Sequence, residues 1–149
     1  LRAFAETMKY TRGYDDNLVA VTDWMYLSLR RLGRHEDAAA LLAPIRPDMD
    51  IIENQAYHKR LLMYKGLIDP ADVLRGTPSG GLDFATLGYG VGYWHLHTGQ
   101  TATALNIFEQ VVEGPYWPAF GYIAAEVELA REHARTQKLS LTRHEERWR

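Results

Sequence analysis

The sequence contains no cysteine among its 149 residues. Disulfide frameworks, cysteine nucleophiles and thiolate zinc sites are therefore excluded, whereas reducing and oxidising compartments both remain open. Also missing is an uninterrupted apolar run of the roughly 20 residues that a membrane helix requires, so we expect no membrane insertion. We expect a soluble protein that is cytoplasmic or, if a signal peptide was removed before Leu1, periplasmic or secreted.

An excess of charge of either sign is missing as well. The 17 basic and 19 acidic residues give a formal net charge of -2, which provides no field to attract nucleic acid. The chain does contain 46% hydrophobic and 11% aromatic residues, enough to bury a core in one ordinary domain. It begins at Leu1 within a helical pattern and without an initiator methionine, so we expect a piece of a longer protein.

Glycine and alanine recur at a fixed interval. Gly33, Gly66 and Gly99 are spaced by 33 residues. An alanine follows each glycine by five positions: Ala38, Ala71 and Ala104. A helix, a reversal that tolerates a positive φ angle and a second helix fit this spacing. We predict helix hairpins in which the small alanine lets two helices approach closely.

The period predicts an all-α fold of about seven to eight helices. The predicted repeat domain spans residues 1–136, with partial units at about 1–14 and 116–136, complete units at 17–47 and 84–115, and a degenerate unit at 50–81. Residues 137–149 mix basic and acidic side chains and lose the apolar pattern, so we expect a charged C-terminal extension that is helical or frayed.

Individual helices are predicted from apolar residues at helical spacing. Residues 23–32 should form the opening helix of the first complete unit, and residues 34–45 its return helix. Residues 49–65 should open the degenerate unit, whose return helix is cut short by the glycine-rich segment 75–81. The last partial unit should begin with a helix at 117–134 that packs through one apolar face: Phe120, Ile123, Val127 and Ala130.

Residues 32–42 and 92–111 resemble the tetratricopeptide repeat family, whose units place small residues and aromatics at fixed offsets from a turn glycine. The resemblance covers most of residues 16–134. It implies an α-solenoid of antiparallel helix hairpins, wound as a right-handed superhelix. The opening helices of such a superhelix line a concave face that holds a protein or peptide.

The same resemblance implies which side chains line the groove. Their offsets from the turn glycines select eight residues: Asp23, Leu27, Arg30, Arg60, Tyr64, Tyr89, Tyr93 and His97. Aromatic and arginine side chains of this kind dominate interface hot spots. The set lacks the Lys and Asn pattern of family members that clamp a C-terminal carboxylate, so we do not predict binding to such tails.

No catalytic, cofactor-binding or metal-binding residue is predicted. His95 and His97 point about 200° apart on a helix, so the two cannot share an ion. We interpret His58 and His95 as hydrogen-bonded packing residues. The carboxylates of residues 48–53 lack the ligand series of an EF-hand, and we interpret them as charges at a helix N-terminus.

Two further clusters favour packing over chemistry. Glycines lie at positions 88, 90 and 92 within a helical pattern and not after a strand, so we expect close helix packing there and no phosphate loop. Trp117 lies in a turn rich in proline and glycine, where we expect it to fill the seam between two helices. The alternative is an exposed aromatic lip that binds a proline-rich or other peptide ligand.

Three functions remain open. A protein- or peptide-binding scaffold leads, with a homo-oligomer possible. The first alternative is an α/α enzyme whose cleft is lined by a small polar set: His58, Arg60, Tyr89, Tyr93 and His97. The second is a structural segment that stacks on neighbouring repeats or on itself. Because no motif meets the geometric tests for catalysis, we predict that the protein is not an enzyme.

Overall fold

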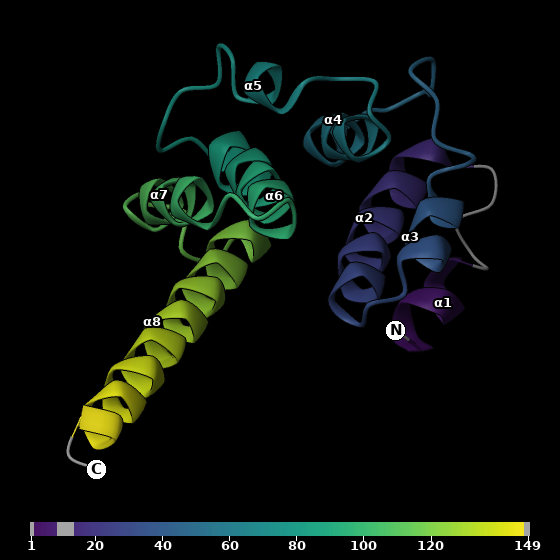
Figure 1. Cartoon of the computed structure of the whole chain (residues 1–149). Helices are drawn as coiled ribbons and strands as arrows, with labels where there is room; N and C mark the ends of the chain where they lie inside the picture. The colour runs from purple at the N-terminus through teal and green to yellow at the C-terminus, as the bar shows by residue number, and fades with distance from the viewer. Residues whose placement is uncertain (1, 9–13, 148–149) are drawn as a thin grey trace. The chain divides into compact units, whose positions relative to one another are not determined.

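The structure is a computed structural model that describes residues 2–8 and 14–147. All regular elements in these ranges are helices (Figure 1), which confirms the predicted all-α class. The chain divides into two compact units, Leu1–Arg75 and Gly76–Arg149. Within the described ranges, no helix is both long enough and apolar enough to cross a membrane.

The first unit is organised around one long helix. Its described helices are α1 (Arg2–Met8), α2 (Asp15–Arg31), α3 (His35–Leu41), α4 (Gln55–Tyr64) and α5 (Pro70–Val73). Helix α2 packs against α1, α3 and α4, and α4 also contacts α5. The core of this unit includes fully or almost fully buried apolar side chains from the helices and from the loop after α3: Val19, Leu29, Ala38, Ile45 and Leu61.

The second unit is a packed set of three helices. They are α6 (Leu82–His97), α7 (Thr101–Val112) and α8 (Phe120–Arg147), and each packs against the other two. Their core consists mainly of buried side chains from all three helices: Phe84, Val91, Ala104, Phe108, Val111 and Ala125. Helix α8 continues beyond α6 and α7 (Figure 1).

The three periodic glycines end three helices in the same way. Gly33, Gly66 and Gly99 have φ angles of 73°, 80° and 83°, which side chains with a Cβ atom rarely adopt. In each turn the residue after the glycine donates its backbone N–H to a carbonyl five residues earlier, as Arg34 does to Leu29 at 3.0 Å. This Schellman-type closure confirms the predicted reversals.

Glycines inside α6 and α8 allow close helix contacts. A Cβ atom added at Gly88 would lie 2.7 Å from Val111, and one at Gly92 would lie 2.5 Å from Phe108. At Gly121 an added Cβ atom would lie 2.1 Å from the carbonyl oxygen of Ala85. These distances confirm that Gly88 and Gly92 of α6 serve close helix packing.

The loop before α4 is held by a carboxylate from the start of α2. Asp16 Oδ1 accepts hydrogen bonds from the backbone N–H groups of Ile52, Glu53 and Asn54 at 2.8, 2.8 and 3.0 Å. Its Oδ2 accepts a further bond from Asn54 Nδ2 at 2.7 Å. These bonds lower the pKa of Asp16, chiefly through the backbone of Asn54, because they favour the ionised form.

Several predicted boundaries differ from the structure. Helix α2 begins eight residues earlier than the predicted 23–32 helix, and α3 ends at Leu41 instead of residue 45. Helix α4 begins at Gln55, so the carboxylates of residues 48–53 lie in the preceding loop and not at the helix start that we predicted for them. The return helix of the degenerate unit is α5, only four residues long, as its interrupted sequence predicts.

Two packing predictions are wrong. Ala38 and Ala104 are fully buried as expected, but Ala71 is exposed because α5 is too short to form a hairpin crossing. Trp117 is 70% exposed and does not fill a helix seam.

The predicted packing face of α8 is also wrong. Phe120, Ile123, Val127 and Ala130 are exposed, and the helix instead packs through a face of small residues and Glu128. The close approach of Gly121 to α6 explains the difference, because large side chains on that face would separate the helices.

Candidate functional site

The eight predicted groove residues all lie on the opening helices of the repeat plan. Helix α2 carries Asp23, Leu27 and Arg30, α4 carries Arg60 and Tyr64, and α6 carries the remaining three. Five of the eight are buried, with exposed fractions of 0 to 4%: Asp23, Leu27, Arg60, Tyr89 and Tyr93. The other three are half-buried: Arg30, Tyr64 and His97. The three half-buried side chains retain solvent-exposed surface, whereas the other five have almost none.

An ion pair joins α2 to α4 in the first unit. Arg60 Nη2 lies 2.7 Å from Asp23 Oδ2, and both side chains have an exposed fraction of 0%. Neither Asp23 oxygen accepts a hydrogen bond within the described residues, so the contact is an ion pair without hydrogen-bond alignment. Burial raises the pKa of Asp23 from 3.8 to about 7, and attraction to Arg60 opposes that rise.

Aromatic rings surround the Arg60 guanidinium. Its central carbon lies 5.6 Å from the ring centre of Trp24 and 5.4 Å from that of Tyr57, within the range of cation–π attraction. Trp24 Nε1 donates a hydrogen bond to Tyr57 Oη at 3.3 Å, and Arg60 Nε donates one to Tyr64 Oη at 3.4 Å. The charged head of Arg60 therefore fixes three aromatic side chains from two helices.

A further contact between α2 and α4 completes this cluster. The rings of Tyr26 and Tyr64 stack with centroids 4.6 Å apart and an interplanar angle of 13°. Burial raises the pKa of Tyr26, and the nearby Arg30 charge partly opposes this effect. We define the α2–α4 aromatic face as four half-buried side chains of these two helices: Trp24, Arg30, Tyr57 and Tyr64.

The predicted residues of α6 form a separate aromatic row in the second unit. Tyr89 lies 5.9 Å from Tyr93 and 5.7 Å from Phe108, measured between ring centroids. The ring of His97 lies 4.2 Å from that of Tyr93. Tyr89 and Tyr93 are buried, whereas His97 at the end of the row is half-buried.

His58 and His95 both make hydrogen-bond contacts as we predicted, but His58 is buried whereas His95 is only half-buried. His58 is buried, and its Nε2 lies 2.7 Å from the carbonyl oxygen of Arg46. His95 Nδ1 lies 3.1 Å from Gln100 Oε1 across the Gly99 turn. In the part of the chain that the structure describes, no group of three or more His, Cys, Asp or Glu side chains could hold a metal ion.

No family model matches this sequence. Comparison with curated proteins gives no match, and comparison with solved structures gives none either. The tetratricopeptide resemblance therefore depends on the periodic residues alone, and it stays a prediction.

Sequence reasoning missed Trp24 and Tyr57, although the period contained a signal for them. The two residues are 33 positions apart, so they occupy equivalent positions of successive repeats, nine residues before Gly33 and Gly66. A search for hydrogen-bonding aromatic pairs at the repeat interval would have selected them, because equivalent positions on adjacent opening helices come together.

Proposed function

We propose that this chain is a helical-repeat scaffold that binds a protein or peptide, and that its hairpins stack as in a tetratricopeptide-like α-solenoid. The observation that carries the proposal is the α2–α4 aromatic face. Its three aromatic side chains and Arg30 are half-buried and lie on the opening helices, which line the concave face in that arrangement.

Rigid support makes this face suitable for binding. Arg60 contacts Trp24, Tyr57 and Tyr64 from within the unit, and its Nη2 lies 2.7 Å from the Asp23 carboxyl group. Aromatic side chains held in one orientation lose little conformational entropy when a ligand binds, and Trp, Tyr and Arg are the residues enriched in interface hot spots. An extended or helical segment with apolar anchors and an acidic group near Arg30 fits this chemistry.

The test compares Tyr57→Ala with Tyr14→Ala. Both variants remove a tyrosine ring from the first unit, but Tyr14 is 67% exposed and lies outside the aromatic face. A displayed library of random peptides is selected against the wild-type chain, and the affinities of the selected peptides are measured by calorimetry. We expect Tyr57→Ala and Arg30→Ala to weaken binding at least about tenfold, as loss of a hot-spot side chain does.

Buried Arg60 is unsuitable for this test, because its removal would leave the fully buried Asp23 carboxyl group without its partner and disturb the fold itself. Peptides that bind all variants equally, or that lose affinity only for Tyr14→Ala, would contradict the assignment of the site. Circular dichroism of each variant excludes unfolding as the cause of any loss.

A further inference from the structure

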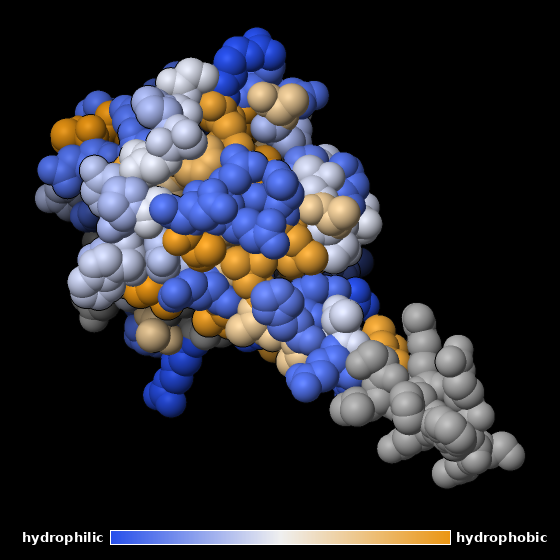
Figure 2. Space-filling view, turned by 90° about the vertical axis from the view of Figure 1, so that its left-hand side faces the viewer, coloured by the Kyte–Doolittle hydropathy of each residue, from blue (hydrophilic) through white to orange (hydrophobic). Residues whose placement is uncertain are grey.

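An apolar stripe runs along the side of α8 that is turned away from α6 and α7. Phe120 is 67% exposed, Ile123 46% and Val127 42%, and Ala130 and Ala134 are exposed as well. We call these five residues the α8 seam. They are spaced alternately by three and four residues, the a and d pattern of a two-helix coiled coil. Figure 2 shows hydrophobic surface on the side of the molecule that carries α7 and α8.

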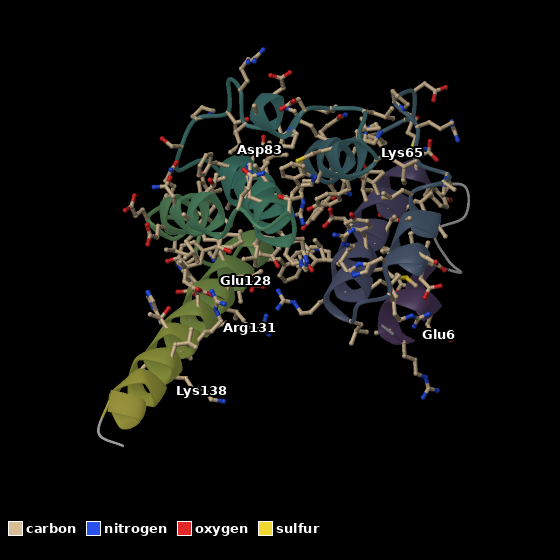
Figure 3. All side chains as sticks on the ribbon, viewed as in Figure 1. Glu6, Lys65, Asp83, Glu128, Arg131 and Lys138 are labelled. Carbon is tan, nitrogen blue, oxygen red and sulfur yellow. The ribbon has the colours of Figure 1, made fainter. Side chains whose placement is uncertain are left out.

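Residues 133–139 of α8 lie outside the packing of its own unit. Among residues 120–139, for which the structure describes the burial, the buried positions are Gly121, Ala125 and Glu128. Arg131, which pairs with Glu128 at 3.3 Å, and Lys138 follow on the extended part (Figure 3). Residues 133–139 are all exposed. Because an isolated polar helix is only marginally stable in water, this segment is suited to contact with another helix.

We propose that α8 pairs with α8 of a second copy of this chain in antiparallel orientation. The seam has large side chains at its N-terminal end and alanines at its C-terminal end. With Val127 opposite Ala130 of the second copy, Ile123 lies opposite Ala134 of the second copy. A large side chain then meets a small one in each of these layers, which lets the helices interdigitate. The extended half of each helix covers the exposed apolar half of the other.

A polar pair fits the same alignment. In an antiparallel coiled coil, residues that flank the seam on one edge of a helix face the residues on the corresponding edge of the other helix. This register brings the carboxylate of Glu126 beside the imidazole of His133 of the second copy, which can donate a hydrogen bond to it. The two-fold symmetry repeats the contact, so each dimer contains it twice. A parallel pair would instead place the bulky Phe120 rings together and leave the alanine halves with little side-chain surface to bury.

The proposed interface is small. The seam spans about 15 residues, or about 22 Å of helix, so the contact falls in the class of weak and transient interfaces. We therefore expect a monomer–dimer equilibrium with a dissociation constant on the order of 10 to 100 µM.

Sedimentation equilibrium of the full chain tests the association. The average mass should rise from 17.1 kDa toward twice that value as the protein concentration passes through the range expected for the dissociation constant. The Val127→Glu variant should remain monomeric, because dimer formation would have to bury the new carboxylate in the apolar seam. Leu82→Glu is the matched control, since Leu82 is 53% exposed on α6 and outside the seam. A wild-type chain that stays monomeric throughout, or equal dissociation by both variants, would overturn the proposal.

Orientation is tested by disulfide formation, for which the absence of cysteine provides a clean background. Ile123→Cys and Ala134→Cys proteins, one carrying a mass tag, are mixed and oxidised. Antiparallel pairing predicts that the mixed disulfide exceeds both homodimeric disulfides. Predominance of the homodimeric species, or no cross-link between any copies, would show that α8 does not pair in this way.

Discussion

Asp23 combines complete burial with a nearby positive charge, and these act on its protonation in opposite directions. Burial dominates and raises the pKa to about 7, well above the value near 3.8 that an unfolded chain would have. At a pH between these two pKa values, Asp23 keeps its proton in the folded chain but has lost it in the unfolded chain. The free energy of unfolding should therefore fall as pH rises from about 4 to about 7, by up to roughly 4 kcal/mol for a shift of this size.

Denaturant titrations of the wild type and Asp23→Asn across this pH range measure the effect. Asn cannot titrate, so the variant should gain stability relative to the wild type as pH rises. The difference between the two curves removes the contributions of all other carboxylates. Parallel curves would mean that Asp23 is already ionised in the folded chain at pH 4.

Asp16 illustrates the opposite case, a carboxylate that is stabilised in its charged form. It accepts four hydrogen bonds from residues 52–54, whereas its neighbour Asp15 accepts one, from the backbone of Asp50. We expect Asp16→Ala to lower the free energy of unfolding by about 2 kcal/mol and Asp15→Ala by less than about 1 kcal/mol, since bonds to a charged acceptor are the stronger class. Urea unfolding at pH 7 gives both values, and similar losses would contradict the role of Asp16 as the anchor.

Residue-level prediction from the sequence succeeded where one position determines the outcome. A turn that needs positive φ selects glycine, and Gly33, Gly66 and Gly99 were found in this way. Asp16 was not found, because its partners lie more than 30 residues away in a loop without periodic pattern. The identity of such long-range partners depends on how the helices pack, which no local spacing encodes.

Among whole helices, the contact between α6 and α7 depends on the missing side chains of Gly88 and Gly92. Alanine normally favours a helix over glycine by about 1 kcal/mol, so Gly92→Ala should stabilise α6 if local propensity decided the result. The Phe108 ring lies where the added methyl group would go. We therefore expect Gly92→Ala to lower the free energy of unfolding by about 1 to 3 kcal/mol, the usual consequence of overpacking.

A double-mutant cycle with Phe108→Leu identifies the cause. Leucine lacks the ring edge that lies within 2.5 Å of the added Cβ position, so Gly92→Ala should be much less harmful in that background. Equal losses in both backgrounds would show that the glycine is needed for another reason.

Helix α8 shows why periodicity alone misassigned a face. The apolar residues Phe120, Ile123 and Val127 form the strongest stripe on this helix, yet the helix packs through Gly121 and Ala125. Small residues permit the shortest distance between helix axes, and that approach determined the packing face. Hydropathy patterns measure the tendency to be buried, but they do not distinguish burial within the chain from burial against a partner.

For the whole molecule, the 33-residue interval predicted helix hairpins but not their grouping. The short α5 interrupts the series, and the chain divides near Arg75 into two compact units. The sequence-based prediction placed residues 1–136 in one repeat domain. It did not identify the degenerate segment 75–81 as the place where the chain divides into two compact units. Contacts between helices define compact units, and the repeat period does not contain that information.

The second unit should fold without the first, because α6, α7 and α8 all pack against one another around their own buried core. We expect a fragment of residues 76–149 to be helical and to unfold cooperatively, with lower stability than typical of larger domains because a chain of this size buries less of its surface. Thermal unfolding is followed by circular dichroism in the far and the near ultraviolet. The far-ultraviolet signal measures helix content, and the near-ultraviolet signal of aromatic residues such as Tyr93 and Phe108 reports tertiary packing. Helical signal without a cooperative aromatic transition would mean that the three helices need further contacts to form a fixed core.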